Sequence, residues 1–363
     1  MMALELASHL LLEYTRDNVA DMHHETFEQE MTDQVRALIV ETTGEDHPDA
    51  VHQALDLLRF HTPCRVGNFA WPQPDIEDVL AELDKQAPMA QRTKEWYDVR
   101  HNIITASAAH KLFGSPAKFN ELVYEKCTDV VEHAPCTSGP RHWGVKYEPV
   151  SIMYYEHTCG AKVQEYGCII HPKYPFLGAS PDGINVAKDS PRYGRMLEIK
   201  NPVSRELSNT PKEEYWIQTQ LQMEVCNIDA CDFLETKFIE YSEAEFDADG
   251  TFTESAQGDP KGIIVLMCVG GANVYKYPPF GCSREEFTEW EAQLEGEWVL
   301  SHYWKLVDVE CTLIQRNTEW FKSALPTLQR AWDTVLSERA SGEFVHRAPK
   351  KKGHAAEECL MLD

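Results

Sequence analysis

Residues 178–202, which read GASPDGINVAKDSPRYGRMLEIKNP, constrain the fold most strongly, because they alternate short apolar runs with turn residues. Asp182 comes at the end of one predicted strand, and Glu198 and Lys200 lie on a second predicted strand after a turn. Side chains alternate along a strand, so Glu198 and Lys200 share one face while Ile199 points to the other. The segment therefore requires a β-sheet that carries an acid and a base together on one face.

This spacing also predicts a metal site. If the two strands pair as a hairpin, Asp182 meets Glu198, and the two carboxylates can bind a divalent cation together with the carbonyl oxygen of Ile199. Ligands that are all oxygen suit Mg²⁺ or Mn²⁺. Such an ion activates water and neutralises a scissile phosphate, and Lys200 can stabilise the negative charge that develops. Charged pairs at this spacing also occur on ordinary solvated sheets, so the pattern alone leaves a structural role open.

The pattern from Lys94 onward is mixed α/β, and the part before it is helical. The predicted strands are 162–171, 176–179, 196–199, 233–241 and 262–269. The predicted helices are 35–40, 50–60, 75–85, 213–226, 285–302 and 317–339. Thr210 is expected as the N-cap of helix 213–226, with Pro211 at its first position. Residues 243–260 are expected to form an acidic, solvated loop.

Three regions follow from this pattern. We expect a helical accessory region at 1–90, a catalytic α/β domain at 91–340 and a flexible tail at 341–363. The break at 71–74 separates two helices of the accessory region. In the tail, Lys350, Lys351 and Lys352 fit either a nuclear-import patch or a solvated charge run.

The net charge of −25 argues against nucleic-acid binding only when the charge is summed over the whole chain. Residues 1–84 carry −14, residues 85–212 carry +4 and residues 213–363 carry −15. The longest uncharged apolar run, 262–271, is too short to cross a bilayer, so no membrane partner is expected. These values predict a locally basic groove in an acidic protein.

The 11 cysteines are scattered and odd in number, which predicts reduced thiols and an intracellular location. Only Cys127, His133, Cys136 and His142 approach the spacing of zinc ligands, and scattered buried thiols are the better interpretation.

The sequence S-P-D-G at Asp182 followed by L-E-I-K at Glu198 and Lys200 resembles the PD-(D/E)xK nucleases. Among these it is similar to the lambda-exonuclease, or YqaJ-type, viral recombinases. The resemblance implies an α/β, restriction-endonuclease-like core, in which helices flank a central mixed sheet, plus an N-terminal helical extension. It also implies that Asp182, Glu198 and Ile199 bind the metal.

Upstream, Trp96-x-x-x-Arg100 and the I-T-A-S run at 104–107 resemble the part of the family that holds a 5′-terminal phosphate. The resemblance assigns this role to Arg100, Thr105, Ser107 and Ser180. Thr105 is expected to cap a helix that runs towards Gly114, which would offer free backbone N–H groups to an anion. An ordinary capped helix beside a surface arginine is the alternative.

Two further residues enter through the resemblance. Glu148 corresponds to an additional acidic residue of the active site. Gln218 belongs to a Y-x-x-Q-x-Q motif and shares a helix face with Tyr215 and Gln222, whereas Gln220 faces away. Gln218 is expected to orient Lys200 or a phosphate oxygen, and a solvent-facing polar side is the alternative.

The resemblance implies a Mg²⁺-dependent exodeoxyribonuclease that digests double-stranded DNA from its ends, 5′ to 3′, in recombination or repair. Mn²⁺ is an alternative cofactor. The expected partners are DNA ends and a single-strand annealing protein, and a homo-oligomer is left open. An endonuclease or end-processing nuclease of the same fold, or an inactive DNA-end-binding protein, are the alternatives. A virus-encoded protein of the cytoplasm or nucleus fits these features.

Overall fold

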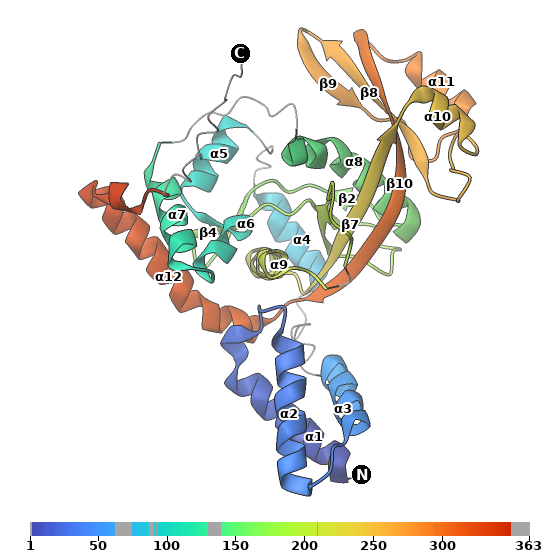
Figure 1. Ribbon diagram of the computed structural model, residues 1–363. Helices are drawn as coiled ribbons and strands as arrows, with labels where there is room; N and C mark the ends of the chain where they lie inside the picture. Colours follow the sequence, from blue (N-terminus) through green and yellow to red (C-terminus); the bar gives the residue numbers. More distant parts are fainter. Residues whose placement is uncertain are drawn as a thin grey trace, which may run out of the picture.

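The computed structural model describes residues 2–61, 75–86, 91, 93–129, 139–208 and 210–349. The predicted break at 71–74, His133, Cys136 and the patch Lys350–Lys352 lie outside the described residues. In the described part, the predicted α/β fold is confirmed, because helices flank a central mixed sheet and further helices form the N-terminal part (Figure 1). None of the described helices is long and apolar enough to cross a membrane.

The central sheet has seven strands in the order β2-β5-β6-β7-β10-β8-β9. The pair β6–β7 is parallel and its other pairs are antiparallel. A second sheet has the order β1-β4-β3. The bounds of the central strands are β2 (Val163–Gln164), β5 (Gly183–Asn185), β6 (Met196–Lys200), β7 (Ala230–Tyr241), β8 (Lys261–Val269), β9 (Ala272–Lys276) and β10 (Glu297–Gln315). Those of the second sheet are β1 (Ile104–Thr105), β3 (Ile169–Ile170) and β4 (Leu177–Ala179).

The helices fall into two groups. Helices α1 (Met2–Asp17), α2 (Phe27–Thr43) and α3 (Pro48–His61) project away from the sheets (Figure 1). Around the sheets lie α4 (Ile76–Lys85), α5 (Lys94–His101), α6 (Ala106–Ala109), α7 (Pro116–Cys127), α8 (Gly139–Cys159), α9 (Glu213–Cys226), α10 (Glu243–Ala248), α11 (Arg284–Glu291) and α12 (Thr318–Ser341). Short 3₁₀ turns occur at η1 (Val19–Asp21), η2 (His110–Leu112) and η3 (Phe344–Arg347).

Asp182 lies between β4 and β5, where the chain passes from one sheet to the other. The expected hairpin between the strand that Asp182 ends and the strand of Glu198 is wrong, because β6 pairs with β5, with Gly183 opposite Leu197. The strand predicted at 176–179 is β4, which pairs with β1 and β3 instead. Asp182 therefore precedes the strand that pairs with β6, and the junction places it beside that strand.

Helix α9 covers the residues predicted for it, but its N-cap differs. Lys212 is the N-cap and makes no side-chain capping bond, so the expected capping by Thr210 with Pro211 in the first turn is wrong. The backbone N–H of Glu213 instead donates to the carboxylate of Glu25, with N–Oε1 at 3.0 Å. The physical reason is tertiary, because the chain between η1 and α2 reaches the end of α9 and supplies the acceptor that the helix needs.

Three other predicted elements need correction. The helix predicted at 285–302 ends at Glu291, and the residues from Glu297 onward pair with β8 as part of β10. The strand predicted at 162–171 divides into β2 and β3, which belong to different sheets. The loop predicted at 243–260 begins with α10, which Ser242 and Glu245 start with a capping box. Sheet pairing and local capping, rather than the apolar pattern, decide these segments.

Gly194 provides a test of how the β5–β6 turn packs against α4. It has φ +78°, and an added Cβ would overlap the Ile76 side chain of α4. We expect Gly194→Ala to lower the free energy of unfolding by about 2 kcal/mol or more, through backbone strain and the overlap. Gly258 has φ +88° and open space around it, so Gly258→Ala tests strain alone at about 1–2 kcal/mol.

Urea titration monitored by circular dichroism measures both variants. The double variant Gly194→Ala with Ile76→Ala should recover part of the loss, because it removes the overlapping atoms. Equal destabilisation by Gly194→Ala and Gly258→Ala would show that α4 does not pack closely against this turn.

Candidate active site

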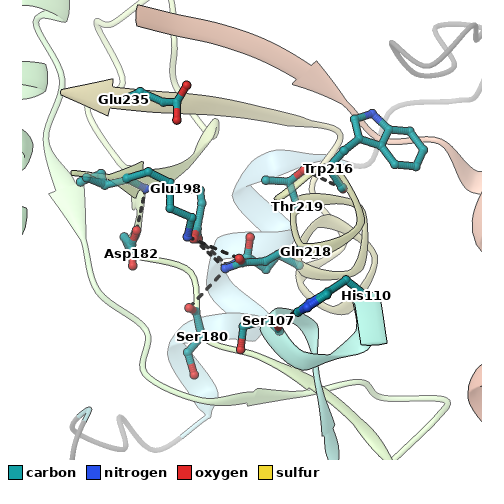
Figure 2. A network of polar contacts seen from close by, with 12 residues as sticks. Ser107, His110, Ser180, Asp182, Glu198, Trp216, Gln218, Thr219 and Glu235 are labelled. Carbon is teal, nitrogen blue, oxygen red and sulfur yellow. Dashed lines mark hydrogen bonds and ion pairs between the residues drawn. The ribbon is translucent and has the colours of Figure 1, made fainter. Parts of the chain in front are cut away.

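Asp182 reaches strand β6 through its side chain. Its Oδ2 atom accepts a hydrogen bond from the backbone N–H of Ile199 at 2.6 Å. Strand β5 begins only at Gly183, so the carboxylate takes the place that a backbone carbonyl would occupy in a longer strand. This bond places the Asp182 carboxylate next to Glu198 and Lys200 (Figure 2).

Glu198 is only 2% exposed and is surrounded by donors. Its Oε1 atom accepts from Nε2 of Gln218 at 2.6 Å, and its Oε2 atom accepts from Nε2 of Gln222 at 2.7 Å. Lys200 completes the set as an ion pair with Glu198. Burying an ionised carboxylate without such partners would cost several kcal/mol, so these donors stabilise Glu198 in its buried position.

Lys200 carries the positive charge of the site. Burial opposes that charge, but the negative charges of Glu198 and Asp182 raise the pKa of Lys200 above its ordinary value. The Tyr215 ring lies 5.1 Å from Nζ and adds a cation–π contact. Lys200 is therefore an ammonium at neutral pH, held at the carboxylates.

The carboxylates outnumber the ammonium group. Burial, followed by the negative charges of Glu198 and Glu148, raises the pKa of Asp182 well above its ordinary value. Glu148 comes from α8 and lines the same groove as Asp182 and Ile199. This excess of negative charge on carboxylate oxygens is the chemistry that a divalent cation such as Mg²⁺ or Mn²⁺ prefers, although the ligand oxygens of the three acids do not all lie within 4.8 Å of one another.

Arg100 forms a second polar cluster. Its guanidinium donates to Oγ of Ser180 at 3.3 Å and to Oγ of Ser107 at 3.2 Å, and it stacks 4.1 Å from the centre of the Trp96 ring. Among the described residues, no carboxylate forms an ion pair with Arg100. Burial lowers the pKa of Arg100, so an anion bound here would offset the cost of burying its charge.

Thr105 is the N-cap of α6, as expected, but its side chain makes no capping bond, and its Oγ1 lies 3.4 Å from Oγ of Ser107. The helical segment runs towards Gly114 in two short pieces, the four residues of α6 and the 3₁₀ turn η2 that ends at Leu112. The capping bond is missing because Thr105 is part of β1, which pairs with β4 and holds its buried side chain in the sheet.

Gln222 links the two clusters. In addition to the bond with Glu198, its Nε2 atom lies 3.5 Å from the carbonyl oxygen of Ser180. The sequence interpretation singled out Gln218 and used Gln222 only to define its face, although the i, i+4 spacing is the signal for a shared contact. Gln220 faces away, with Nε2 bonded to the carbonyl of Gln315 at 2.8 Å.

A groove of about 590 Å³ opens over the carboxylates. Besides Glu148, Asp182 and Lys200, it is lined by three basic residues, which are Arg141, Arg205 and Lys212. The lining thus holds carboxylates together with a basic rim made by these three side chains, of which Arg205 already pairs with Glu235. Such a rim favours a polyanionic ligand.

A family comparison finds a match in the middle of the chain. Residues 95–229 match the family described as the YqaJ-like viral recombinase domain. The matched segment holds Asp182, Glu198 and Lys200 and both glutamines. The predicted family resemblance is confirmed for the matched segment.

A curated relative and two solved structures are similar over larger parts of the chain. The uncharacterized protein R354 of Acanthamoeba polyphaga mimivirus is 31% identical over 318 residues, covering 75% of this chain and 57% of the relative. The chain thus spans little more than half the length of that protein. An alkaline exonuclease from Laribacter hongkongensis has 19% identity and a TM-score of 0.42, covering 69% of this chain and 96% of that one. A phage-related exonuclease from Haemophilus somnus 129PT has 15% identity and a TM-score of 0.35, covering 67% and 98%.

Replacing Asp182 tests its electrostatic environment. The raised pKa of Asp182 means that folding disfavours the ionised form of this carboxylate. The contribution of Asp182 to the free energy of unfolding therefore falls as the pH rises from 3.8, the ordinary pKa, towards the pKa in the folded protein. Asp182→Asn keeps an acceptor for the Ile199 amide and removes the charge. At pH 7 in EDTA, we expect Asp182→Asn to have a higher Tm than the unaltered protein. Each kcal/mol of removed electrostatic cost should raise the Tm by about 2–4 °C. The difference in Tm should shrink towards pH 4.

Thermal unfolding at several pH values measures this effect. Glu289→Gln, which neutralises an exposed carboxylate, should leave the Tm nearly unchanged. A Tm of Asp182→Asn at or below that of the unaltered protein at pH 7 would contradict the assigned environment.

Proposed function

We propose that the chain is a metal-dependent deoxyribonuclease that digests double-stranded DNA from its ends, 5′ to 3′. The observation that best supports this proposal is that the Gln222 amide contacts both the Glu198 carboxylate and the Ser180 carbonyl. The carboxylate site and the Arg100 cluster therefore lie at a fixed separation. An enzyme that grips a terminal phosphate at one point and cuts at another needs this arrangement.

Asp182, Glu198 and the carbonyl of Ile199 would hold Mg²⁺ or Mn²⁺, with Glu148 as the further acid. When bound, the ion supplies a polarised water and charge neutralisation at the phosphate. Lys200 orients the nucleophilic water and stabilises the negative charge of the transition state. Gln218 keeps Glu198 and Lys200 in place, because it donates to one and lies 3.4 Å from the other.

Arg100, Ser107 and Ser180 would hold the 5′-terminal phosphate, and Thr105 supports Ser107 from beneath. A guanidinium can donate two hydrogen bonds to a phosphate, and the two hydroxyls already face it. Because the phosphate pocket is adjacent to the carboxylates, a strand that enters by its 5′ end would be cut close to that end. This support favours exonuclease over endonuclease activity.

The wider setting is also part of the proposal. Residues 1–90 would be an accessory region, residues 91–340 the nuclease domain and residues 341–363 a tail. DNA ends are the proposed substrate, and a single-strand annealing protein that receives the 3′ tail is the proposed partner in recombination or repair.

Digestion of a linear duplex tests the proposal directly. With Mg²⁺ and an end-labelled duplex, we expect release of nucleotides from 5′ ends, no cutting of closed circular DNA, and a loss of about 10²–10³-fold in rate for Lys200→Ala. Lys188→Ala, which removes a surface lysine paired with Glu77, serves as the matched control and should keep its activity. Cutting of closed circles would favour the endonuclease alternative, and unchanged activity of Lys200→Ala would overturn the site.

Replacing Arg100 tests whether the enzyme recognises the 5′-phosphate and so digests from the 5′ end. Loss of a charge-assisted hydrogen bond costs about 1.5–3 kcal/mol, so Arg100→Ala should weaken use of a 5′-phosphorylated duplex by about 10–100-fold. The same variant should lose most of its preference for 5′-phosphate over 5′-hydroxyl ends. Arg284→Ala, at an exposed arginine, is the control. An undiminished preference in Arg100→Ala would place the phosphate elsewhere.

A further inference from the structure

A second cluster of metal-ligand side chains lies outside the candidate active site. His23 and His24 come from the segment between η1 and α2, and Glu213 is the first residue of α9. Nε2 of His23 lies 3.9 Å from Oε1 of Glu213, and Nδ1 of His24 lies 3.4 Å from Oε2 of the same carboxylate. One ligand atom from each of the three residues falls within 4.8 Å of the others.

We propose that His23, His24 and Glu213 bind a Zn²⁺ ion that fastens the N-terminal helices to α9. Zn²⁺ takes histidine nitrogen and carboxylate oxygen at about 2.0–2.2 Å, which places the ligand atoms of a tetrahedral site about 3.3–3.5 Å apart. The two His–Glu separations, 3.9 Å and 3.4 Å, run to different oxygens of Glu213, and one ligand atom from each residue lies within 4.8 Å of the others, so side-chain rotations bring the set to this value. Two imidazoles suit Zn²⁺ rather than the Mg²⁺ expected at the carboxylates.

The outer contact of His23 is that of a metal ligand. Nδ1 of His23 lies 2.8 Å from the carbonyl oxygen of Ala20, which can only accept, so we assign the proton to Nδ1 and the lone pair to Nε2. The indole N–H of Trp320 also approaches this nitrogen, at 3.3 Å, and could donate to it only in the other tautomer, so the assignment follows the shorter contact. Nε2 of His24 lies 4.0 Å from Oδ1 of Asp21, beyond hydrogen-bond distance, and Nδ1 is the nitrogen of His24 that lies nearer Glu213. A carbonyl behind the ring is a usual way to orient a ligating histidine, as at His23.

The cluster is also held in place and open to solvent. Met22 is buried, its sulfur contacts the amide of Asn317 at 3.0 Å, and Glu25 accepts from the N–H of Glu213 at 3.0 Å. These contacts fix the segment against both α12 and α9. The side chains of His24 and Glu213 remain 44% and 33% exposed, which gives an ion a route into the site.

The consequence concerns how the two parts of the chain are joined. Helix α9 carries Gln218 and Gln222, which hold the buried Glu198. An ion bound at its first residue would stabilise the contact between the N-terminal helices and the helix that supports the active site. This inference does not depend on nuclease activity, and its readout is binding and stability.

Titration of the metal-free full-length protein with Zn²⁺, by calorimetry and by thermal unfolding, tests the site. We expect one Zn²⁺ per chain and a rise in Tm, with at least tenfold weaker binding and no rise in Tm for His24→Ala and for Glu213→Gln. His9→Ala, at an exposed histidine beside Glu13, is the matched control and should bind like the unaltered protein. Cys127→Ser should also keep full binding, because the thiols are not ligands of this site.

Co²⁺ in place of Zn²⁺ separates the ligand types. We expect visible d–d bands of a tetrahedral nitrogen and oxygen site, lost in His24→Ala and without a thiolate charge-transfer band. Binding of Zn²⁺ that is equal in His24→Ala and the unaltered protein, binding that is lost in Cys127→Ser, or no binding at all would overturn the proposal.

Discussion

The burial of the Glu198 carboxylate is the constraint on which the centre of the molecule depends. A carboxylate that is 2% exposed must be matched by donors, because water cannot reach it. Lys200 supplies one from the same strand, and Gln218 and Gln222 supply two from α9. The position of α9 against the sheet is thus set by polar contacts as well as by apolar packing.

Helix α9 in turn connects regions that are distant in the sequence. Its buried glutamines face in two directions, with Gln222 towards Ser180 and Gln220 towards Gln315 at the end of β10. Its first N–H is satisfied by Glu25 of the N-terminal part. A single helix therefore contacts the acidic cluster, the Arg100 cluster and the segment between η1 and α2, in keeping with its burial on nearly all sides.

The two clusters differ in a way that suits two roles. Around Asp182 the acids exceed the cations, which favours a metal ion. Within the described part of the chain, the Arg100 guanidinium contacts two hydroxyls and the Trp96 ring and pairs with no carboxylate, which favours an anion. Under the proposed function, opposite charge preferences side by side would let one phosphate be held while a neighbouring one is cut. The basic rim formed by Arg141, Arg205 and Lys212 would guide the rest of the backbone.

The sequence by itself determined the features that local geometry controls. Strand alternation placed Glu198 and Lys200 on one face, and helix periodicity turned Gln218 rather than Gln220 towards them. The mixed α/β character also followed from the pattern, whereas the central sheet with flanking helices was implied by the family resemblance. Only the tertiary structure decided the capping of α9 by Glu25, the strand at Glu297–Gln315, the bridge made by Gln222 and the meeting of His23 with Glu213. Each of these joins residues far apart in the chain, and no local pattern encodes such contacts.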